Sequence, residues 1–218
     1  MVAALFKGLA LGFLLAISVG PVIFAIIKQS INHGHKAGYV FVAGVSSSDI
    51  TLLLICNFFT SLFQTALKHQ TLIAVTGSLF LIGVGIYTFF FKKVVVDEEN
   101  NLKEKVFRKR DWVAIFLSGY FMNMLNPGVF IFWFAWSAAI LADSVTHADP
   151  FQYRAVVFGT CLIFVLTTDL LKVSLAGKLR PKLTVKNLHF INRLSGLILI
   201  GFGIALCWGI LSFGDKLK

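Results

Sequence analysis

The chain has 218 residues, of which 57% are hydrophobic and only 14% are charged, and its mean hydropathy is +0.84. This composition excludes an ordinary soluble domain and indicates a membrane protein. The formal net charge of +10 would suit a nucleic-acid-binding protein, but the distribution of the positive residues indicates membrane topology instead.

Six segments are predicted to cross the membrane as helices, because each approaches or exceeds the length of about 20 apolar residues that a helical span requires. In chain order they are residues 8–27, about 37–60, 71–91, 112–142, about 155–176 and 194–213. Four contain no Asp, Glu, Lys or Arg, whereas the second contains Asp49 and the fifth contains Asp169 and Lys172. We therefore expect an all-α integral membrane protein that is a single transmembrane domain.

The positive residues gather on one side of this arrangement. Fifteen lie in or beside the first, third and fifth connections, and five lie on the other side. The positive-inside rule then places these three connections in the cytoplasm and both termini outside. The densely charged residues 92–111 are predicted to form a cytoplasmic linker, and no nucleic-acid partner is expected.

The two halves of the chain resemble each other. "LFLIGVGI" at 79–86 matches "LILIGFGI" at 197–204 in six of eight positions, and "VGPVIF" at 19–24 aligns with "LNPGVF" at 125–130, proline on proline. The acids Asp49 and Asp169 also correspond, at an offset of 120. Because each half has three spans, the second copy enters the membrane inverted. Inverted repeats are typical of secondary transporters.

The repeats therefore cover about 1–91 and 112–218. Each contains a proline inside an apolar run, in Gly20-Pro21 and Asn126-Pro127. One interpretation is a kink that neighbouring helices accommodate. The other is a broken helix, whose half-helix ends attract the carboxylate and the ammonium of an amino acid zwitterion. Recurrence in both halves favours the broken helix.

The remaining candidate site residues are polar groups inside the predicted spans. Asp49 could hold a substrate amine or exchange a coupling proton, or it could lie near water at a displaced end of its span. Asp169 and Lys172, three apart on one helix face, could neutralise each other or act in transport. Asn126 is the better candidate for contacting the substrate, and Pro127 is the better candidate for shaping the helix break. The predicted substrate path consists of Gly20, Pro21, Asp49, Asn123, Asn126, Pro127 and Asp169.

Other residue types are predicted to be structural. The three cysteines, Cys56, Cys161 and Cys207, fall within spans without CxxC spacing, and the five histidines lie in connections, so no metal or cofactor is expected. Gly83, Gly85, Gly201 and Gly203 are predicted to be close-packing positions.

These motifs resemble the lysine-exporter (LysE/RhtB) family of amino acid exporters over nearly the whole chain. The resemblance is carried by Gly20-Pro21, by glycines 34, 38 and 44 followed by Asp49, by "FMNMLNP" at 121–127, and by "INRLSGLILIGFGIAL" at 191–206. It implies export of amino acids or related small metabolites across the bacterial cytoplasmic membrane, driven by the proton gradient or the membrane potential. Val22, Ile23, Ser48 and Gly128 depart from the family pattern, so the resemblance does not identify the substrate.

Three other functions compete with the exporter. A cation or heavy-metal exporter is disfavoured because soft metals prefer thiolate and imidazole ligands, which are not clustered. An integral membrane enzyme would need a nucleophile or metal constellation, and none is apparent. A membrane scaffold is disfavoured by the two acids and the matched breaks. The small-residue faces allow a homodimer without requiring one.

Overall fold

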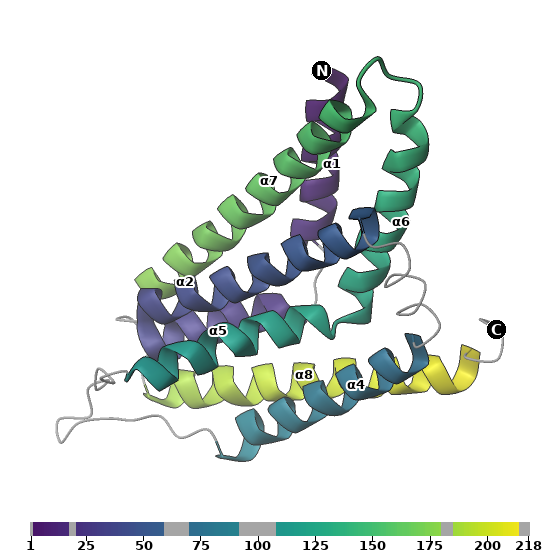
Figure 1. The fold of residues 1–218 in the computed structure, drawn as a ribbon. Helices are drawn as coiled ribbons and strands as arrows, with labels where there is room; N and C mark the ends of the chain where they lie inside the picture. Colours follow the sequence, from purple (N-terminus) through teal and green to yellow (C-terminus); the bar gives the residue numbers. More distant parts are fainter. Residues whose placement is uncertain (1, 18–20, 59–69, 92–107, 180–184, 214–218) are drawn as a thin grey trace.

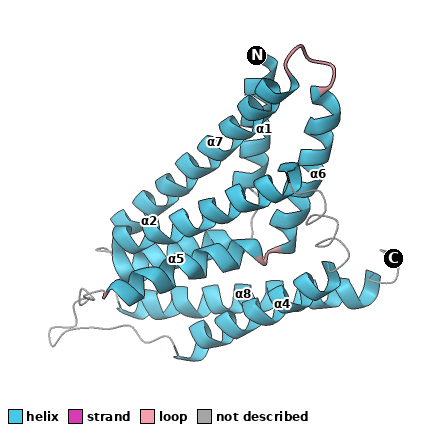
Figure 2. Ribbon diagram, in the orientation of Figure 1, coloured by secondary structure: helices cyan, strands magenta, loops and turns pink. Residues whose placement is uncertain are grey.

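The computed structural model describes residues 2–17, 21–58, 70–91, 108–179 and 185–213. Every regular element in these ranges is a helix, as Figure 2 shows, and this confirms the all-α prediction. The elements are α1 (Val2–Ile17), α2 (Pro21–Phe58), α4 (Gln70–Ile86), the π-helix η1 (Tyr87–Phe91), α5 (Lys109–Met124), α6 (Pro127–Ser144), α7 (Pro150–Leu179) and α8 (Val185–Phe213).

Both prolines begin a helix instead of kinking one. The predicted span 8–27 is divided between α1, which ends at Ile17, and α2, which starts at Pro21. The predicted span 112–142 is divided between α5 and α6, whose axes differ by 61°. Proline suits the first position of a helix because it lacks an N–H that would have no partner there. The described helices agree with the broken-helix interpretation, whereas binding of a substrate by the half-helix ends stays a prediction.

The long helix α2 reverses direction at Gly34. This glycine has φ 82°, a left-handed conformation that favours glycine. In a straight helix the eight residues from Ser30 to Gly38 would rise about 12 Å. Instead, Ser30 Oγ lies directly against Gly38. Residues 21–33 and 35–58 are therefore two arms, and the longer arm contains residues 37–58 of the predicted second span.

Helices of the two halves pack against each other through glycines. Gly8 of α1 lies against the Val157 carbonyl of α7, and Gly119 of α5 lies against the Phe41 carbonyl of α2. Gly85 of α4 meets Gly196 of α8, and Figure 1 shows these two helices side by side. Glycine permits such approaches because a side chain at these positions would meet backbone atoms.

The glycine prediction is correct at two of the four positions. Gly85 and Gly203 are buried where α4 and α8 touch. Gly83 and Gly201 are exposed, and a Cβ atom added to either would meet nothing within 4 Å. In each Gly-x-Gly pair the second glycine packs and the first faces outward, because residues two apart on a helix do not share a face.

Two of the described helices are long and apolar enough to cross a membrane, Pro21–Asn57 and Pro150–Lys178. The bent pair formed by Lys109–Met124 and Gly128–Ser144 would be a third span. Shorter apolar helices cover Val2–Ile17, Val75–Phe91 and His189–Ala205. The arrangement of six spans in two inverted repeats stays a prediction. Residues 92–107 of the predicted linker lie outside the described residues, as do the last five residues of the chain.

Candidate functional site

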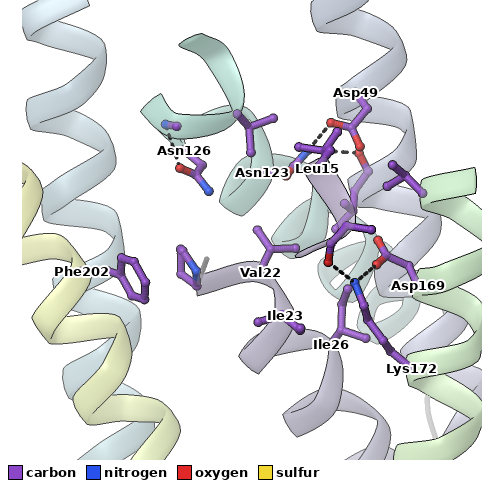
Figure 3. A pocket seen from close by; sticks show the side chains of 16 residues that line it. Leu15, Val22, Ile23, Ile26, Asp49, Asn123, Asn126, Asp169, Lys172 and Phe202 are labelled. Carbon is purple, nitrogen blue, oxygen red and sulfur yellow. Dashed lines mark hydrogen bonds and ion pairs between the residues drawn. The ribbon is translucent and has the colours of Figure 1, made fainter. Parts of the chain in front are cut away.

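A cavity of about 220 Å³ lies where the two helix breaks meet, and Figure 3 shows its lining. Its polar side chains come from α2, α5, α7 and the residue that precedes α6, and its walls are mostly aliphatic, with Phe202 contributed by α8. Five of the predicted site residues line it: Pro21, Asp49, Asn123, Asn126 and Asp169. Gly20 lies outside the described residues, and Pro127 is the first residue of α6.

Asp49 is held by two side-chain N–H donors. Its Oδ1 accepts from Asn123 Nδ2 at 2.8 Å and from Trp133 Nε1 at 2.9 Å. The Asp49 residue is 3% exposed, so it does not lie near bulk water at a displaced span end. Both donors use the same oxygen, and Asp49 Oδ2 receives no hydrogen bond from the described residues. This arrangement compensates part of the cost of a buried carboxylate while leaving an acceptor beside the cavity.

Asn123 is an anchor between α5 and α2. Besides Asp49, its Nδ2 donates to Ser48 Oγ at 2.6 Å and lies 3.4 Å from the Val45 carbonyl oxygen. All three partners belong to one turn of α2 next to the α5 helix end. Asn123 therefore fixes the end of α5 as well as the orientation of the Asp49 carboxylate.

Asp169 is paired with Lys172, and the pair holds the end of α1. Lys172 Nζ lies 2.8 Å from Asp169 Oδ1 and donates to the Ala16 carbonyl oxygen at 3.2 Å. Ala16 is in the last turn of α1, where carbonyl groups lack helical partners and the helix dipole is negative. The lysine therefore neutralises the Asp169 carboxylate and caps a helix end at the same time.

The two acids are placed reciprocally. Asp49, in the first half of the chain, bonds to Asn123 at the helix break of the second half. Asp169, in the second half, is joined through Lys172 to the helix break of the first half. Neither carboxylate has all of its partners within its own half of the chain. Residues of both halves are therefore needed to form the cavity.

Asn126 caps α6 with its own side chain. Its Oδ1 accepts from the Gly128 backbone N–H at 3.0 Å, and its carbonyl accepts from Val129 N at 3.1 Å. Asn126 Nδ2 donates to none of the described residues. Asn is a preferred N-cap because its oxygen satisfies an N–H that the helix itself cannot. One side-chain atom thus shapes the break, while the amide nitrogen is available to a ligand.

Sequence reasoning assigned no role to Trp133, which is fully buried and donates to Asp49. A usable signal existed, because an indole N–H in an apolar span needs an acceptor and the acids within spans are few. The contact of Lys172 with the Ala16 carbonyl could not have been found that way, since it joins residues 156 positions apart.

Within the described residues, no group of three or more His, Cys, Asp and Glu side chains could hold a metal ion. The three cysteines are free, and Cys161 is fully buried. The chemistry of the cavity is therefore that of carboxylate, ammonium and amide groups. It offers acceptors for an amine and donors for a carboxylate within one small apolar enclosure.

Comparison with known proteins identifies the family. The model for LysE type translocators matches residues 13–209 of the chain. The chain belongs to this family. As a LysE type translocator it is a multi-pass membrane protein, as its apolar helices indicate.

The translocator also resembles a protein of Bacillus subtilis (strain 168) named "Putative amino acid efflux protein YcgF". The two are 27% identical over 195 residues, which cover 89% of this chain and 90% of the relative. No solved structure matches the chain. The family and the relative support a transport role over an enzymatic one.

Proposed function

We propose that this translocator exports amino acids or closely related small metabolites from the bacterial cytoplasm, driven by the proton gradient or the membrane potential. One observation carries the proposal: two buried carboxylates from corresponding helices line a single cavity at the junction of two broken helices. Such a site between repeats is typical of secondary transporters. Efflux of amino acids is also the role named for the Bacillus subtilis relative.

In the proposed binding mode, the cargo ammonium approaches Asp49 Oδ2. The cargo carboxylate lies toward Lys172 and Asn126 Nδ2, and the cargo side chain contacts the aliphatic wall. Both half-helices that follow the breaks, at Pro21 and Pro127, begin beside the cavity, and helix N-termini favour a carboxylate. The predicted substrate path, including Gly20 and Pro127, is part of this proposal.

The proposed architecture is a single domain of six spans in two inverted three-helix repeats, about 1–91 and 112–218. The linker 92–111 is cytoplasmic and both termini lie outside. Alternating access then consists of movement of one repeat against the other around the cavity. The reciprocal pairing of each acid with the opposite break supports this architecture, because a shift between repeats would alter both acid sites together.

The test is uptake into everted membrane vesicles, in which export appears as inward transport. We expect uptake of at least one of twenty labelled amino acids when a proton gradient and membrane potential are imposed, and none without them. Asp49→Asn should abolish this uptake, because it removes the charge that holds the ammonium, while the protein remains inserted.

The matched control is Asp149→Asn. Asp149 is an exposed acid that accepts from the Gln152 N–H at the start of α7, and asparagine caps equally well. Uptake by this variant should equal that of wild type. The exporter proposal fails if no amino acid accumulates under the imposed gradient, and cadmium uptake instead would favour the cation exporter.

A further inference from the structure

Hydrocarbon side chains from α1, α2, α6, α7 and α8 line most of the cavity. We call them the apolar wall, and they are Leu15, Val22, Ile23, Ile26, Val45, Val129, Val165 and Phe202. All except Phe202 are aliphatic. In Figure 3, Phe202 lies on the opposite side of the view from Asp169 and Lys172. A cargo bound to the charged groups can therefore extend its side chain toward Phe202.

The charged groups of the described lining have partners assigned before any cargo side chain is considered. They are Asp49, Asp169 and Lys172. In the proposed binding mode, Asp49 binds the cargo ammonium and Lys172 binds the cargo carboxylate. Asp169 is paired with Lys172, with 2.8 Å between Oδ1 and Nζ. A basic cargo side chain would compete with Lys172 for Asp169, and an acidic one would compete with the cargo's own carboxylate for Lys172.

The apolar wall favours a cargo side chain without polar atoms. A polar or charged group that leaves water without finding a partner is strongly destabilised. An aliphatic side chain loses no hydrogen bond, and each methylene that it buries is worth a factor of about four in affinity. The wall therefore discriminates by hydrophobicity as well as by charge.

Three positions that depart from the family pattern lie in the lining of the cavity. They are Val22, Ile23 and Gly128, and none has a polar side chain. Gly128 also keeps space open beside Asn126. Outside its own stretch of helix, a Cβ atom at Gly128 would come within 4 Å of Asn126 Oδ1 alone, at 3.3 Å. The departures thus fall where they can change which cargo fits.

The size of the cavity limits the length of the side chain. Its volume of about 220 Å³ is below the range of about 300–1,000 Å³ that is usual for ligand pockets. The ring of Phe202 occupies part of the wall to which a longer side chain would extend. A short aliphatic chain suits this space better than a second aromatic ring.

We propose that the cavity selects amino acids with a neutral aliphatic side chain, of the size of valine, leucine, isoleucine or methionine. Val22 and Ile23 supply apolar contacts, and Phe202 sets the upper limit of size. The inference rests on the proposed export of amino acids and names the cargo class of the same site.

The first test compares cargo classes in wild-type everted vesicles under an imposed gradient. KM for leucine should be at least about tenfold lower than KM for alanine, because one methylene in a hydrophobic pocket is already worth about tenfold or more. KM for lysine and for glutamate should be higher still. A KM for lysine or glutamate at or below that of leucine would overturn the aliphatic class, while export of amino acids would stand.

Val22→Thr tests the polarity of the wall, because it keeps the branched shape and replaces a methyl group with a hydroxyl. KM for leucine should rise about fourfold or more. The matched control is Val113→Thr on α5, where the valine is 57% exposed and does not line the cavity. Its KM should equal that of wild type. An equal KM in the two variants would contradict the contact with Val22.

Phe202→Ala tests the limit of size. Removal of the ring should lower KM for phenylalanine relative to KM for leucine by about tenfold, since a larger side chain then fits. Phe190→Ala removes an exposed phenylalanine from the same helix and should leave this ratio unchanged. An unchanged ratio in Phe202→Ala would show that Phe202 does not limit the cargo.

Binding in detergent separates the cargo class from transport. Purified wild type should gain at least about 2 °C in Tm with leucine at about 10 mM, a concentration above the usual range of KM. Lysine hydrochloride and sodium glutamate should give no gain over sodium chloride of equal ionic strength. Equal Tm with all three amino acids would overturn the selectivity, even if uptake is observed. Stabilisation by leucine alone, without uptake of any amino acid, would support the cargo class and contradict the proposed export.

Discussion

Trp133 is a positioning residue for the Asp49 carboxylate. Its indole lies fully inside the protein, and its Nε1 shares the Asp49 Oδ1 with Asn123. The indole therefore directs one carboxylate oxygen into the protein, and the other oxygen is the one to which the proposed cargo ammonium would bind.

Trp133→Phe should weaken both the fold and transport. The ring volume is largely kept, but one donor to a buried carboxylate is lost, which costs about 1–3 kcal/mol of unfolding free energy. We expect a lower Tm in detergent and a higher KM in vesicle uptake. Trp136→Phe is the control, because Trp136 is half-buried on the same helix and packs against Phe132. If both variants behave alike, the Trp133 hydrogen bond has no special role.

Much of the site could be predicted from single residues, and some of it could not. Asp49, Asn123, Asn126 and Asp169 were conspicuous because polar groups within apolar spans are costly. Their placement around one cavity agrees with the expectation, while their role in transport stays a prediction. The capping of Ala16 by Lys172 depends on which helices touch, and residue type alone does not reveal that.

At the scale of the helices, glycine contacts set how closely the halves approach. Gly119 of α5 lies against the Phe41 carbonyl, and Gly44 of α2 lies against the Phe116 carbonyl. These contacts bring α5 and α2 together just beside the Asn123–Asp49 bond. Their spacing therefore controls whether that bond can form.

Gly119→Val should separate the two helices. A Cβ atom at this position would meet backbone, which cannot move as a flexible side chain would, and overpacking costs about 1–3 kcal/mol. We expect a Tm lowered by several degrees and reduced uptake. Gly159→Val on α7 is the control, since a Cβ atom there meets nothing within 4 Å. A Tm for Gly119→Val equal to that of the control would show that this contact does not limit the packing.

Residue type was sufficient to predict the helix boundaries at the two prolines. It was not sufficient where the path of the backbone depends on tertiary contacts. The breaks at Pro21 and Pro127 could be read from residue type. The reversal between the predicted spans 8–27 and 37–60 also followed from the sequence, but it did not show that helix continues up to Gly34 on both sides, with the turn made at this residue at φ 82°.

For the whole molecule, the distribution of charge predicts the orientation in the membrane. A cysteine-free form provides the background for single cysteines at Lys216 and Asn100. In intact cells, a membrane-impermeant maleimide should label Lys216→Cys, because both termini are predicted outside. Asn100→Cys should react only after permeabilisation, because it lies in the predicted cytoplasmic linker. Labelling of Asn100→Cys in intact cells would contradict the orientation and the direction of transport.

The reciprocal pairing of acids and helix breaks has a consequence for biosynthesis. Trp133 follows Asp49 by 84 positions, so at about 5–20 residues per second the ribosome makes it roughly 4 to 17 s later. In the proposed architecture, the first three helices enter the bilayer during that interval with a carboxyl group whose donors have not yet been made. If the first half inserts as the proposed repeat, it has to keep Asp49 near the lipid headgroups, or carry it protonated, until the second half is made.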